Sequence, residues 1–331
     1  MPLISVIMPA YNGEQYIASA VQSVLNQRDA DLELIVVNDG STDRTLEILQ
    51  EFAAADSRVR VINRPNSGRP AFPKNDGIAA ARGDYICFLD QDDLYDPDHA
   101  SQMLLGLEKN IEWIATFHDS QLIDDEGNNL PFTLHSSYDF PARAKPYLTS
   151  LTNDWFECGE LFFIYSCLHV TAVHTQSVMI AKNRLPAGTI FFDTQYTHSD
   201  DSDLWIRLHL LGKIGYLHRV LSSYRKHTHN LTNNLESFQV DRLKLMKKNF
   251  ERIGPKLSEN QLNQLKTKIA NGFCDLGYMQ YKKVNFWEAR IAYREALAWK
   301  TKPKTLLAYS KCFIPKNAIR FIKKIRTKTP N

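Results

Sequence analysis

The first 110 residues alternate between short apolar segments and longer amphipathic ones, and this alternation constrains the fold more than any other feature of the chain. Strands are expected at residues 3–8, 32–37 and 59–62 and in the apolar run that ends at Asp90. Helices are expected at residues 14–27, from Ser41 or Thr42 to about residue 54, and at residues 77–81. Strands that alternate with helices form right-handed βαβ units, so we expect an α/β fold with a Rossmann-like, mostly parallel sheet flanked by helices.

The last of these apolar runs ends in three closely spaced carboxylates. In "GDYICFLDQDD", residues 83–93, the run is followed by Asp90, Asp92 and Asp93. Ligands of open α/β sheets bind just outside the carboxyl ends of the strands. Three acids repel one another there unless a cation joins them, and a hard divalent cation that also holds a phosphate is the usual solution. Taken alone, the same residues also fit an acidic turn before a helix.

Three other loops that follow strands carry side chains suited to a nucleotide. In "PAYNGEQY", Tyr11 offers a flat face on which a base can stack. In "VVNDGSTD", Asp39 can accept hydrogen bonds from a base or a sugar. The loop "NRPNSGRPAFPKNDG" contains three cations suited to a pyrophosphate, namely Arg64, Arg69 and Lys74. Each loop also has a structural interpretation: Tyr11 as a buried ring, Asp43 as a partner of a helix dipole, and one of the three cations as a solvated group.

Beyond residue 110 the regular alternation fades. Two strands around a turn are expected in residues 113–130, one more strand at 177–181, and an amphipathic helix at 202–212 closed by Gly212. Residues 131–175 are aromatic and irregular and are assigned to no element. From residue 235 onward only helices are expected. Residues 276–303 resemble a single tetratricopeptide-like helix pair, which we interpret as a hairpin packed on the preceding domain, with protein docking as the alternative.

Composition restricts the class of protein and its expected location. With 331 residues, 44% of them hydrophobic and 23% charged, the chain is typical of a globular protein with roughly two domains. Its five cysteines are odd in number and lack CxxC spacing, which argues against a disulfide framework or a zinc site and favours the cytoplasm. The sequence shows no signal-peptide pattern and no apolar segment of transmembrane length, so neither is expected.

The net charge of +3 conceals a strongly basic carboxyl-terminal end. Residues 300–331 contain ten Lys or Arg and no Asp or Glu, so the rest of the chain carries −7. The segment "FIPKNAIRFIKKIRTKTPN" places apolar side chains at helical spacing among basic ones, which suits the anionic cytoplasmic face of a membrane. A solvated tail is the equal alternative. Nucleic-acid binding is not expected, because no recognised module accompanies the charge.

These segments together resemble the family 2 glycosyltransferases, inverting enzymes of GT-A fold that use nucleotide sugars. The matching text is "SVIMPAYNGEQYIASAVQSVLNQ", "ELIVVNDGSTDRT", "NSGRPAFPKNDGIAAARGDYICFLDQDD", "DDSDLWIRL" and "YRKH", within about residues 3–230. The resemblance implies that residues 1–110 form the nucleotide-sugar-binding half of a GT-A domain. Residues 111–232 would form its acceptor-binding and catalytic half, with 131–175 on the acceptor side. Residues 233–331 would be a helical extension with the basic tail.

The resemblance also implies roles for individual residues. The nucleoside, usually uridine, would be held by Pro9, Ala10, Tyr11 and Asp39. Asp92 falls where the family binds the Mn²⁺ or Mg²⁺ that bridges the diphosphate, with His227 as the second metal candidate. The family's catalytic Glu-Asp pair aligns with Asp200 and Asp201, of which Asp201 is the candidate general base. The remaining donor contacts implied are Asn12, Glu14, Arg69, Lys74, Asp90, Gln91, Arg225 and His227.

Two positions depart from the family pattern. The catalytic pair is Asp-Asp and not Glu-Asp, which leaves Asp200 as an alternative base. "PKN" replaces the usual "ARN", so Lys74 offers a compact ammonium where the family often has the planar fork of an arginine. A looser contact with the donor phosphates is therefore expected at Lys74.

The expected function is that of a metal-dependent inverting glycosyltransferase of the hexosyltransferase class. It would move a sugar from a nucleotide donor, UDP above all, to a saccharide or lipid-linked hydroxyl in the synthesis of cell-surface polysaccharide or glycoconjugate. Inverting transfer needs a carboxylate that takes the acceptor proton and a cation that neutralises the departing diphosphate. The alternatives are a nucleotidyltransferase on a related fold, or a non-catalytic nucleotide-binding or scaffold protein.

Overall fold

A computed structural model describes residues 2–152, 154–169, 172–228, 230 and 234–313. The chain folds as two compact units, Met1–Asn233 and Asn234–Asn331. The basic tail discussed above, from residue 314 onward, lies outside the described residues.

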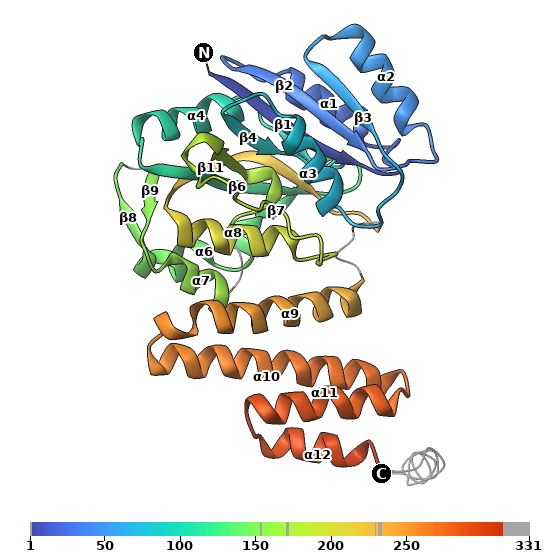
Figure 1. Ribbon diagram of the computed structural model, residues 1–331, viewed down its shortest axis with the longest axis vertical. Helices are drawn as coiled ribbons and strands as arrows, with labels where there is room; N and C mark the ends of the chain where they lie inside the picture. Colours follow the sequence, from blue (N-terminus) through green and yellow to red (C-terminus); the bar gives the residue numbers. More distant parts are fainter. Residues whose placement is uncertain (1, 153, 170–171, 229, 231–233, 314–331) are drawn as a thin grey trace. The chain divides into compact units, whose positions relative to one another are not determined.

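The first unit is built around one mixed sheet (Figure 1). Its strands are β1 (Leu3–Ala10), β2 (Asp31–Asn38), β3 (Val59–Asn63), β4 (Tyr85–Phe88), β5 (Leu94–Tyr95), β6 (Trp113–Ile123), β7 (Asn129–Thr133), β8 (Leu148–Ser150), β9 (Trp155–Cys158), β10 (Val178–Ala181) and β11 (Lys213–Arg225). Its α-helices are α1 (Ile17–Leu25), α2 (Thr45–Ala55), α3 (Ala71–Ala80), α4 (His99–Lys109), α5 (Leu134–Ser137), α6 (Phe140–Ala144), α7 (Phe162–Leu168) and α8 (Asp200–Leu211).

The strand order within the described residues is β3-β2-β1-β4-β10-β6-β11-β9-β8, with β5 on β11 and β7 on β6. β1 to β4 pair in parallel, as the alternating sequence predicts. β10 is antiparallel to both β4 and β6, whereas β6 and β11 are parallel. The parallel pairing brings the carboxyl ends of β1, β2 and β4 to the same edge of the sheet, together with the loops that follow them.

Side chains of alternate residues along each strand fill two apolar layers, one on each face of the sheet. On β1, Ile4, Val6 and Met8 pack into the layer covered by α1 and α4. The neighbouring Ile7 packs into the opposite layer, which α3, α7 and α8 cover. This alternation is the period of a strand that is buried on both faces. On α3, a Cβ added at Gly77 would lie 2.4 Å from Cγ2 of Ile7, so glycine is what lets this helix sit close to β1.

Most elements expected in the first 110 residues are confirmed, but the interpretation of one helix start was wrong. Helix α2 begins at Thr45, and neither Ser41 nor Thr42 caps it. The Ser41 hydroxyl instead accepts the backbone N–H of Asn12, because the loop after β1 needs a partner there. Helix α8 ends at Leu211 and is closed by Gly212, as predicted, although the Gly212 backbone is extended, with φ −177°, and not left-handed. A Cβ at Gly212 would lie 2.8 Å from Ile114, so close packing explains the glycine.

The segment 131–175, to which the sequence analysis assigned no element, contains α5, α6, β8, β9 and α7. Its aromatic side chains form part of the core on the face that α8 covers. Phe140, Phe162 and Tyr165 are each fully buried. They surround Phe117 and Tyr216 of the central strands, with the centroids of Phe140 and Tyr216 5.0 Å apart. The segment therefore adds a layer to the core and is not an open surface loop.

The second unit contains the helices α9 (Leu235–Ile253), α10 (Glu259–Lys282), α11 (Phe286–Trp299) and α12 (Pro303–Lys311), as expected from residue 235 onward (Figure 1). Ser258 and Gln261 form a capping box at the start of α10. A Cβ added at Gly277 would lie 2.9 Å from the Tyr293 ring, so these two residues set the close approach of α10 and α11. No helix in the described ranges has the length and apolarity needed to cross a membrane.

Candidate active site

The loop after β1 is fastened to the loop after β2 by side chains that the sequence analysis assigned to the donor. Asn12 has a left-handed backbone, with φ 48°, and its side-chain oxygen accepts the N–H of Thr42 at 2.8 Å. Glu14 accepts the N–H of Arg44 at 3.0 Å, and Asp43 accepts the N–H of Glu14 at 3.1 Å. These contacts occupy the polar groups of Asn12 and Glu14 with backbone, so both residues position the loop.

The same loop is tied to the end of β4 through Gln91. The Gln91 side chain accepts the N–H of Tyr11 at 2.8 Å and donates to the Tyr11 carbonyl at 2.9 Å. Pro9 and Ala10 end strand β1 just before it, beside Val37 and Asn38 of β2. The Tyr11 side chain is 47% exposed. The ring is therefore free to meet a ligand while its backbone is held, and the interpretation of Tyr11 as a buried ring is wrong.

Asp39 lies at the end of β2 with its carboxylate already in use. It forms an ion pair with Arg64 at 3.1 Å and accepts the Ser67 hydroxyl at 2.7 Å and the Ser67 N–H at 3.1 Å. Asp39 is 5% exposed. Arg64 also pairs with Asp76 at 3.0 Å. Because both of its partners are carboxylates of the protein, Arg64 stabilises the Gly- and Pro-rich loop in which it lies. Arg69, by contrast, has an exposed side chain whose guanidinium donates to the carbonyl of Thr194.

Asp92 and His227 come together across the sheet edge. Nε2 of His227 lies 2.8 Å from Oδ2 of Asp92, and the Asn230 amide lies 3.4 Å from the same oxygen. A carboxylate oxygen and an imidazole nitrogen are suitable ligands for Mn²⁺, and the pair is only partly exposed. Among the described residues no group of three His, Cys, Asp or Glu could hold a metal ion. A cation at this pair would thus take its other ligands from a substrate and from water.

Arg225 is buried and holds the acidic loop in place. Its guanidinium donates to the carbonyls of Asp92, at 3.0 Å, Asp124, at 3.3 Å, and Asp125, at 2.9 Å. It also lies over the Tyr16 ring, 5.0 Å from the centroid. The Arg225 N–H donates to Asp93 at 2.9 Å. These partners occupy the Arg225 donors with backbone, so the geometry makes Arg225 a positioning residue for the loop 90–93.

The acids at the start of α8 meet a buried lysine. Nζ of Lys74 lies 3.2 Å from Oδ2 of Asp200, and the two side chains are 5% and 4% exposed. Burial alone lowers the pKa of Lys74, but the carboxylates of Asp200, Asp90 and Asp201 outweigh it and raise that pKa above its ordinary value. The ammonium stays charged at pH 7. Lys74 therefore links α3, which precedes β4, to the helix that carries the candidate base.

Burial raises the pKa of Asp201 to about 6, and the neighbouring charge of Asp200 acts in the same direction. Lys74 and the hydrogen bonds from Ser202 oppose this rise. Burial also raises the pKa of Asp90 to about 6, against the attraction of Lys74 and with the repulsion of Asp92, Asp200 and Asp201. A carboxyl with a pKa near 6 is ionised at neutral pH yet basic enough to accept a proton. The carboxylates after β4 and at the start of α8 thus share one electrostatic environment.

Two neighbours on α8 are structural. Asp203 pairs with Arg207 one turn later, at 2.7 Å. Trp205 is 1% exposed and contacts Phe88, so it belongs to the core. Two residues of the site were not predicted from the sequence. Tyr16 lies under Arg225, with its ring centroid 4.9 Å from that of His227, and Asn230 lies beside Asp92. The only signal for Tyr16 was its place in "PAYNGEQY".

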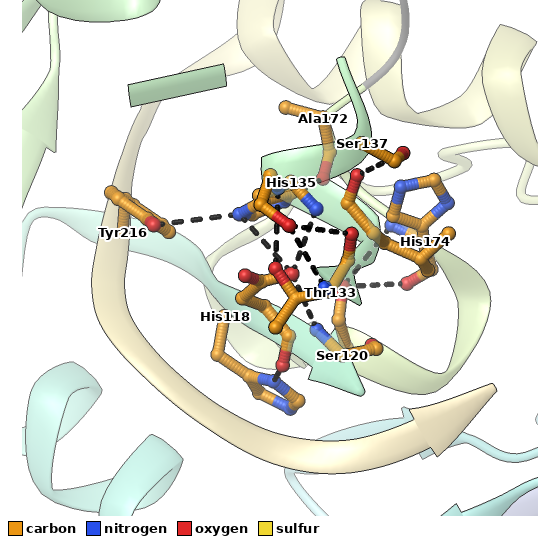
Figure 2. Close-up of polar contacts among 12 residues, drawn as sticks. His118, Ser120, Thr133, His135, Ser137, Ala172, His174 and Tyr216 are labelled. Atoms are coloured by element: carbon orange, nitrogen blue, oxygen red, sulfur yellow. Dashed lines mark hydrogen bonds and ion pairs between the residues drawn. The ribbon is translucent and has the colours of Figure 1, made fainter. Parts of the chain in front are cut away.

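A second buried polar network was also missed. Asp119 on β6 accepts the N–H of Ser120 at 2.7 Å and of His135 at 2.9 Å, and Nε2 of His135 lies 2.8 Å from the Ala172 carbonyl (Figure 2). Burial lowers the pKa of His135 to about 4, so the ring is neutral at pH 7 and its Nε2–H donates to that carbonyl. The network ties the start of α5 to the chain before β10. Its members are far apart in the sequence, and no local pattern marks them.

The fold is that of GT-A glycosyltransferases. A fragment of Staphylococcus aureus TarS, residues 1–349, in complex with UDP-GlcNAc superposes with a TM-score of 0.58 and 18% identity over 93% of this chain and 79% of that one. A mannosyltransferase from Pyrobaculum calidifontis, solved with GDP-Man and Mn²⁺, superposes with a TM-score of 0.55 and 15% identity, over 98% of this chain and 82% of that one. At these identities the similarity concerns the fold alone.

Sequence comparison points to one family of enzymes. Residues 5–157, just under half of the chain, match the model of glycosyl transferase family 2. Escherichia coli chondroitin synthase is 28% identical over 257 residues, which cover 77% of this chain and 34% of that protein. An uncharacterized glycosyltransferase of Haemophilus influenzae is 37% identical over 157 residues, 47% of this chain and 60% of that protein. The chain thus spans less than two thirds of either relative.

The position of Arg225 generates a prediction about stability. In Arg225→Lys a single ammonium cannot reach the three carbonyls that the guanidinium fork serves, and the carbonyls left unpaired should lower the free energy of unfolding by about 2–3 kcal/mol. Urea denaturation measures this loss. Arg219→Lys is the matched control, because Arg219 lies on the same strand with a side chain that is 51% exposed. Equal unfolding free energies for the two variants would contradict the role given to Arg225.

Proposed function

We propose that this chain is a metal-dependent inverting glycosyltransferase that moves a sugar from a UDP donor to a hydroxyl of a saccharide or lipid-linked acceptor. The observation that carries the proposal is the shared environment of two acidic groups, Asp90 with Asp92 after β4 and Asp200 with Asp201 on α8. The first group suits a metal diphosphate, and the second suits a general base. Transfer with inversion needs both groups close together, so that one group receives the proton while the other neutralises the leaving group.

The nucleoside would lie across the carboxyl ends of β1 and β2. The exposed Tyr11 ring offers a stacking face for the base, next to Pro9 and Ala10. Asp39 would accept hydrogen bonds from the base or the ribose, and its contacts with Arg64 and Ser67 would hold it in place for that purpose. Arg69, with its exposed side chain, is the cation best placed among the loop residues to approach the diphosphate from solvent.

Asp92 and His227 would hold the Mn²⁺ or Mg²⁺. A divalent ion bound there supplies charge neutralisation for the departing diphosphate. Two hydrogen bonds hold Asp92 in place: Arg225 donates to the Asp92 carbonyl, and the Asn230 amide donates to the Asp92 carboxylate. Asp90, at the end of β4, would contact the ribose or the sugar of the donor.

Asp201 would act as the general base. As the acceptor oxygen forms its bond to the anomeric carbon, the acceptor O–H proton passes to the Asp201 carboxylate. The bond from the anomeric carbon to the diphosphate oxygen breaks on the opposite face, and its electron pair leaves with UDP. No other reactant is needed. A pKa of about 6 keeps Asp201 ionised before transfer and still able to bind the proton.

The relatives favour polysaccharide synthesis as the process. One relative is a chondroitin synthase of Escherichia coli, and another is a hyaluronan synthase of Pasteurella multocida, 28% identical over 249 residues. We infer from them a saccharide acceptor for this chain. A nucleotidyltransferase would need a basic fingerprint near the first loop, which "PAYNGEQY" lacks. A scaffold protein would have no need of acids at 92 and 201.

Asp201→Asn should bind UDP as the wild type does but lose catalysis, because an amide cannot accept the proton. We expect a fall in turnover of about 10²–10⁴-fold, measured as UDP release from UDP-sugars. In the wild type the rate should fall about tenfold per pH unit below pH 6, as Asp201 becomes protonated, and level off above it. Asp31→Asn, at the opposite end of the sheet, is the control. Near-normal turnover in Asp201→Asn would move the base elsewhere, first to Asp200.

Asp92→Asn should abolish the stimulation of UDP binding by Mn²⁺. Loss of a supporting contact typically weakens metal affinity 10–100-fold, so loss of a direct ligand should cost at least about tenfold. Calorimetric titration of UDP with and without Mn²⁺ measures the effect, and His227→Ala should behave in the same way. Asp98→Asn, which removes a carboxylate that is 49% exposed, is the control. If Asp92→Asn keeps its Mn²⁺-dependent affinity, the metal is bound by other residues.

A peripheral contact with an anionic membrane is also part of the proposal. In the second unit, Trp287 and Phe313 are 65% and 55% exposed, and the Arg290 guanidinium lies 5.2 Å and 5.0 Å from their ring centroids. Exposed aromatic rings beside basic groups suit the interface of an anionic bilayer. Deletion of residues 314–331 should remove co-sedimentation with vesicles that contain phosphatidylserine. Binding that persists at the wild-type level after the deletion would contradict the proposal for the tail.

A further inference from the structure

Lys74 occupies an unusual position for a residue expected to bind donor phosphate. It lies on α3, its side chain is 5% exposed, and its ammonium lies 3.2 Å from Asp200 and 4.8 Å from the centroid of the Phe192 ring. An ammonium covered in this way presents almost no surface to a ligand. Asp200, which is also buried, is the one hydrogen-bonded side-chain partner of Lys74 among the described residues.

The pair is part of a compact group of charges. The charged groups that act on Lys74 are Asp200 and Asp201 on α8 and Asp90 after β4. Those that act on Asp201 are Asp200, which repels its charge, and Lys74, which attracts it. Asp200 is buried together with Lys74, and Asp90 and Asp201 are half-buried. These acids depend on the ammonium for their stability, since burial of unpaired charge is costly. Removal of the Lys74 ammonium therefore changes the electrostatic environment of the Asp201 carboxylate.

We propose that Lys74 is a positioning residue for the base Asp201, acting through its ion pair with Asp200, and that it is not a ligand of the donor diphosphate. Asp200 and Asp201 are the first two residues of α8, so an anchored Asp200 fixes the first turn on which Asp201 stands. The ammonium also offsets the repulsion that Asp200 exerts on Asp201. The proposal rests on the proposed function for the role of Asp201, but the contact itself does not.

The departure from the "ARN" pattern gains a physical reason in this account. A lysine ammonium is a compact point charge on a flexible stem, whereas a guanidinium is a larger planar fork. The space between α3, α8 and the Phe192 ring holds the ammonium in contact with one carboxylate. Asp200 stands where the family has a glutamate, and its carboxylate accepts the Lys74 ammonium at 3.2 Å.

The test measures the titration of Asp201 directly, by ¹³C NMR of protein labelled at the Asp carboxyl carbons. The Asp201 signal is the one lost in Asp201→Asn. In the wild type we expect it to titrate near pH 6. Lys74→Met, without the ammonium, should shift the midpoint upward by at least about one pH unit, and Lys74→Arg should keep it near the wild-type value. Asp200→Asn removes the repelling charge and should shift it downward.

Arg60→Met is the matched control. It breaks another ion pair, formed with the buried Glu33 at 2.8 Å at the opposite end of the sheet, and should cost stability without moving the Asp201 midpoint. If Lys74→Met does not fold, the other two variants test the proposal. A downward shift of the Asp201 midpoint in Asp200→Asn and an unchanged midpoint in Lys74→Arg would support it. An unshifted midpoint in folded Lys74→Met, or in Asp200→Asn, overturns the proposal.

Measurements of UDP binding and of activity distinguish a positioning role of Lys74 from a donor-binding role. They also test the proposed function separately from the Lys74–Asp200 pairing. Calorimetry with UDP and Mn²⁺ should give the same affinity, within about twofold, for the wild type and Lys74→Met, while a loss of tenfold or more would restore Lys74 as a donor ligand. In UDP release from UDP-GlcNAc, UDP-glucose or UDP-galactose, the acid limb of the pH profile should follow the NMR midpoint. A wild type that neither binds UDP nor releases it would refute the proposed function, while the NMR shift would still decide the pairing.

Discussion

The neutralisation of an acidic sheet edge by buried cations is the constraint on which the rest of the site depends. The parallel order of β1, β2 and β4 brings acids to a single edge, where like charges repel. Arg64 pairs with Asp39 and Lys74 pairs with Asp200, while Arg225 holds the loop 90–93 through its backbone carbonyls. Because the protein satisfies most of these charges itself, the Asp92–His227 pair is left as the place where an external cation and a diphosphate would complete the balance.

This division separates residues that hold the site from residues that meet a ligand. The loops are fixed by side chains that are hydrogen-bonded to backbone groups, namely those of Asn12, Glu14 and Arg225. Tyr11 and Arg69 have exposed side chains. A diphosphate is bound best by groups whose geometry is already set, since less freedom is then lost on binding. The residues bonded to backbone thus keep the loops rigid, and the exposed side chains of Tyr11 and Arg69 are the groups that can contact a ligand.

The sequence predicted the parts of the fold that local pattern determines. Alternating apolar runs predicted the places of β1 to β4 along the chain, and parallel pairing then brought Asp39 and Asp90 to the same edge. It did not predict the partners of Lys74 and Arg225, which lie 126 and 133 residues away along the chain, because such pairs depend on tertiary packing. The segment 131–175 escaped assignment for the same reason. Its short elements are stabilised by aromatic packing on Phe117 and by the Asp119–His135 network, not by their own periodicity.

The central claim is that Asp201 takes the proton of an incoming hydroxyl while the diphosphate leaves from the opposite face. The most direct measurement is ¹H NMR of the sugar released when the enzyme hydrolyses a UDP-α-sugar in the presence of Mn²⁺, read before the anomers equilibrate. The account predicts that the β-anomer forms first and that Asp201→Asn does not form it at a detectable rate. The α-anomer as first product, or an unchanged rate in Asp201→Asn, would contradict it.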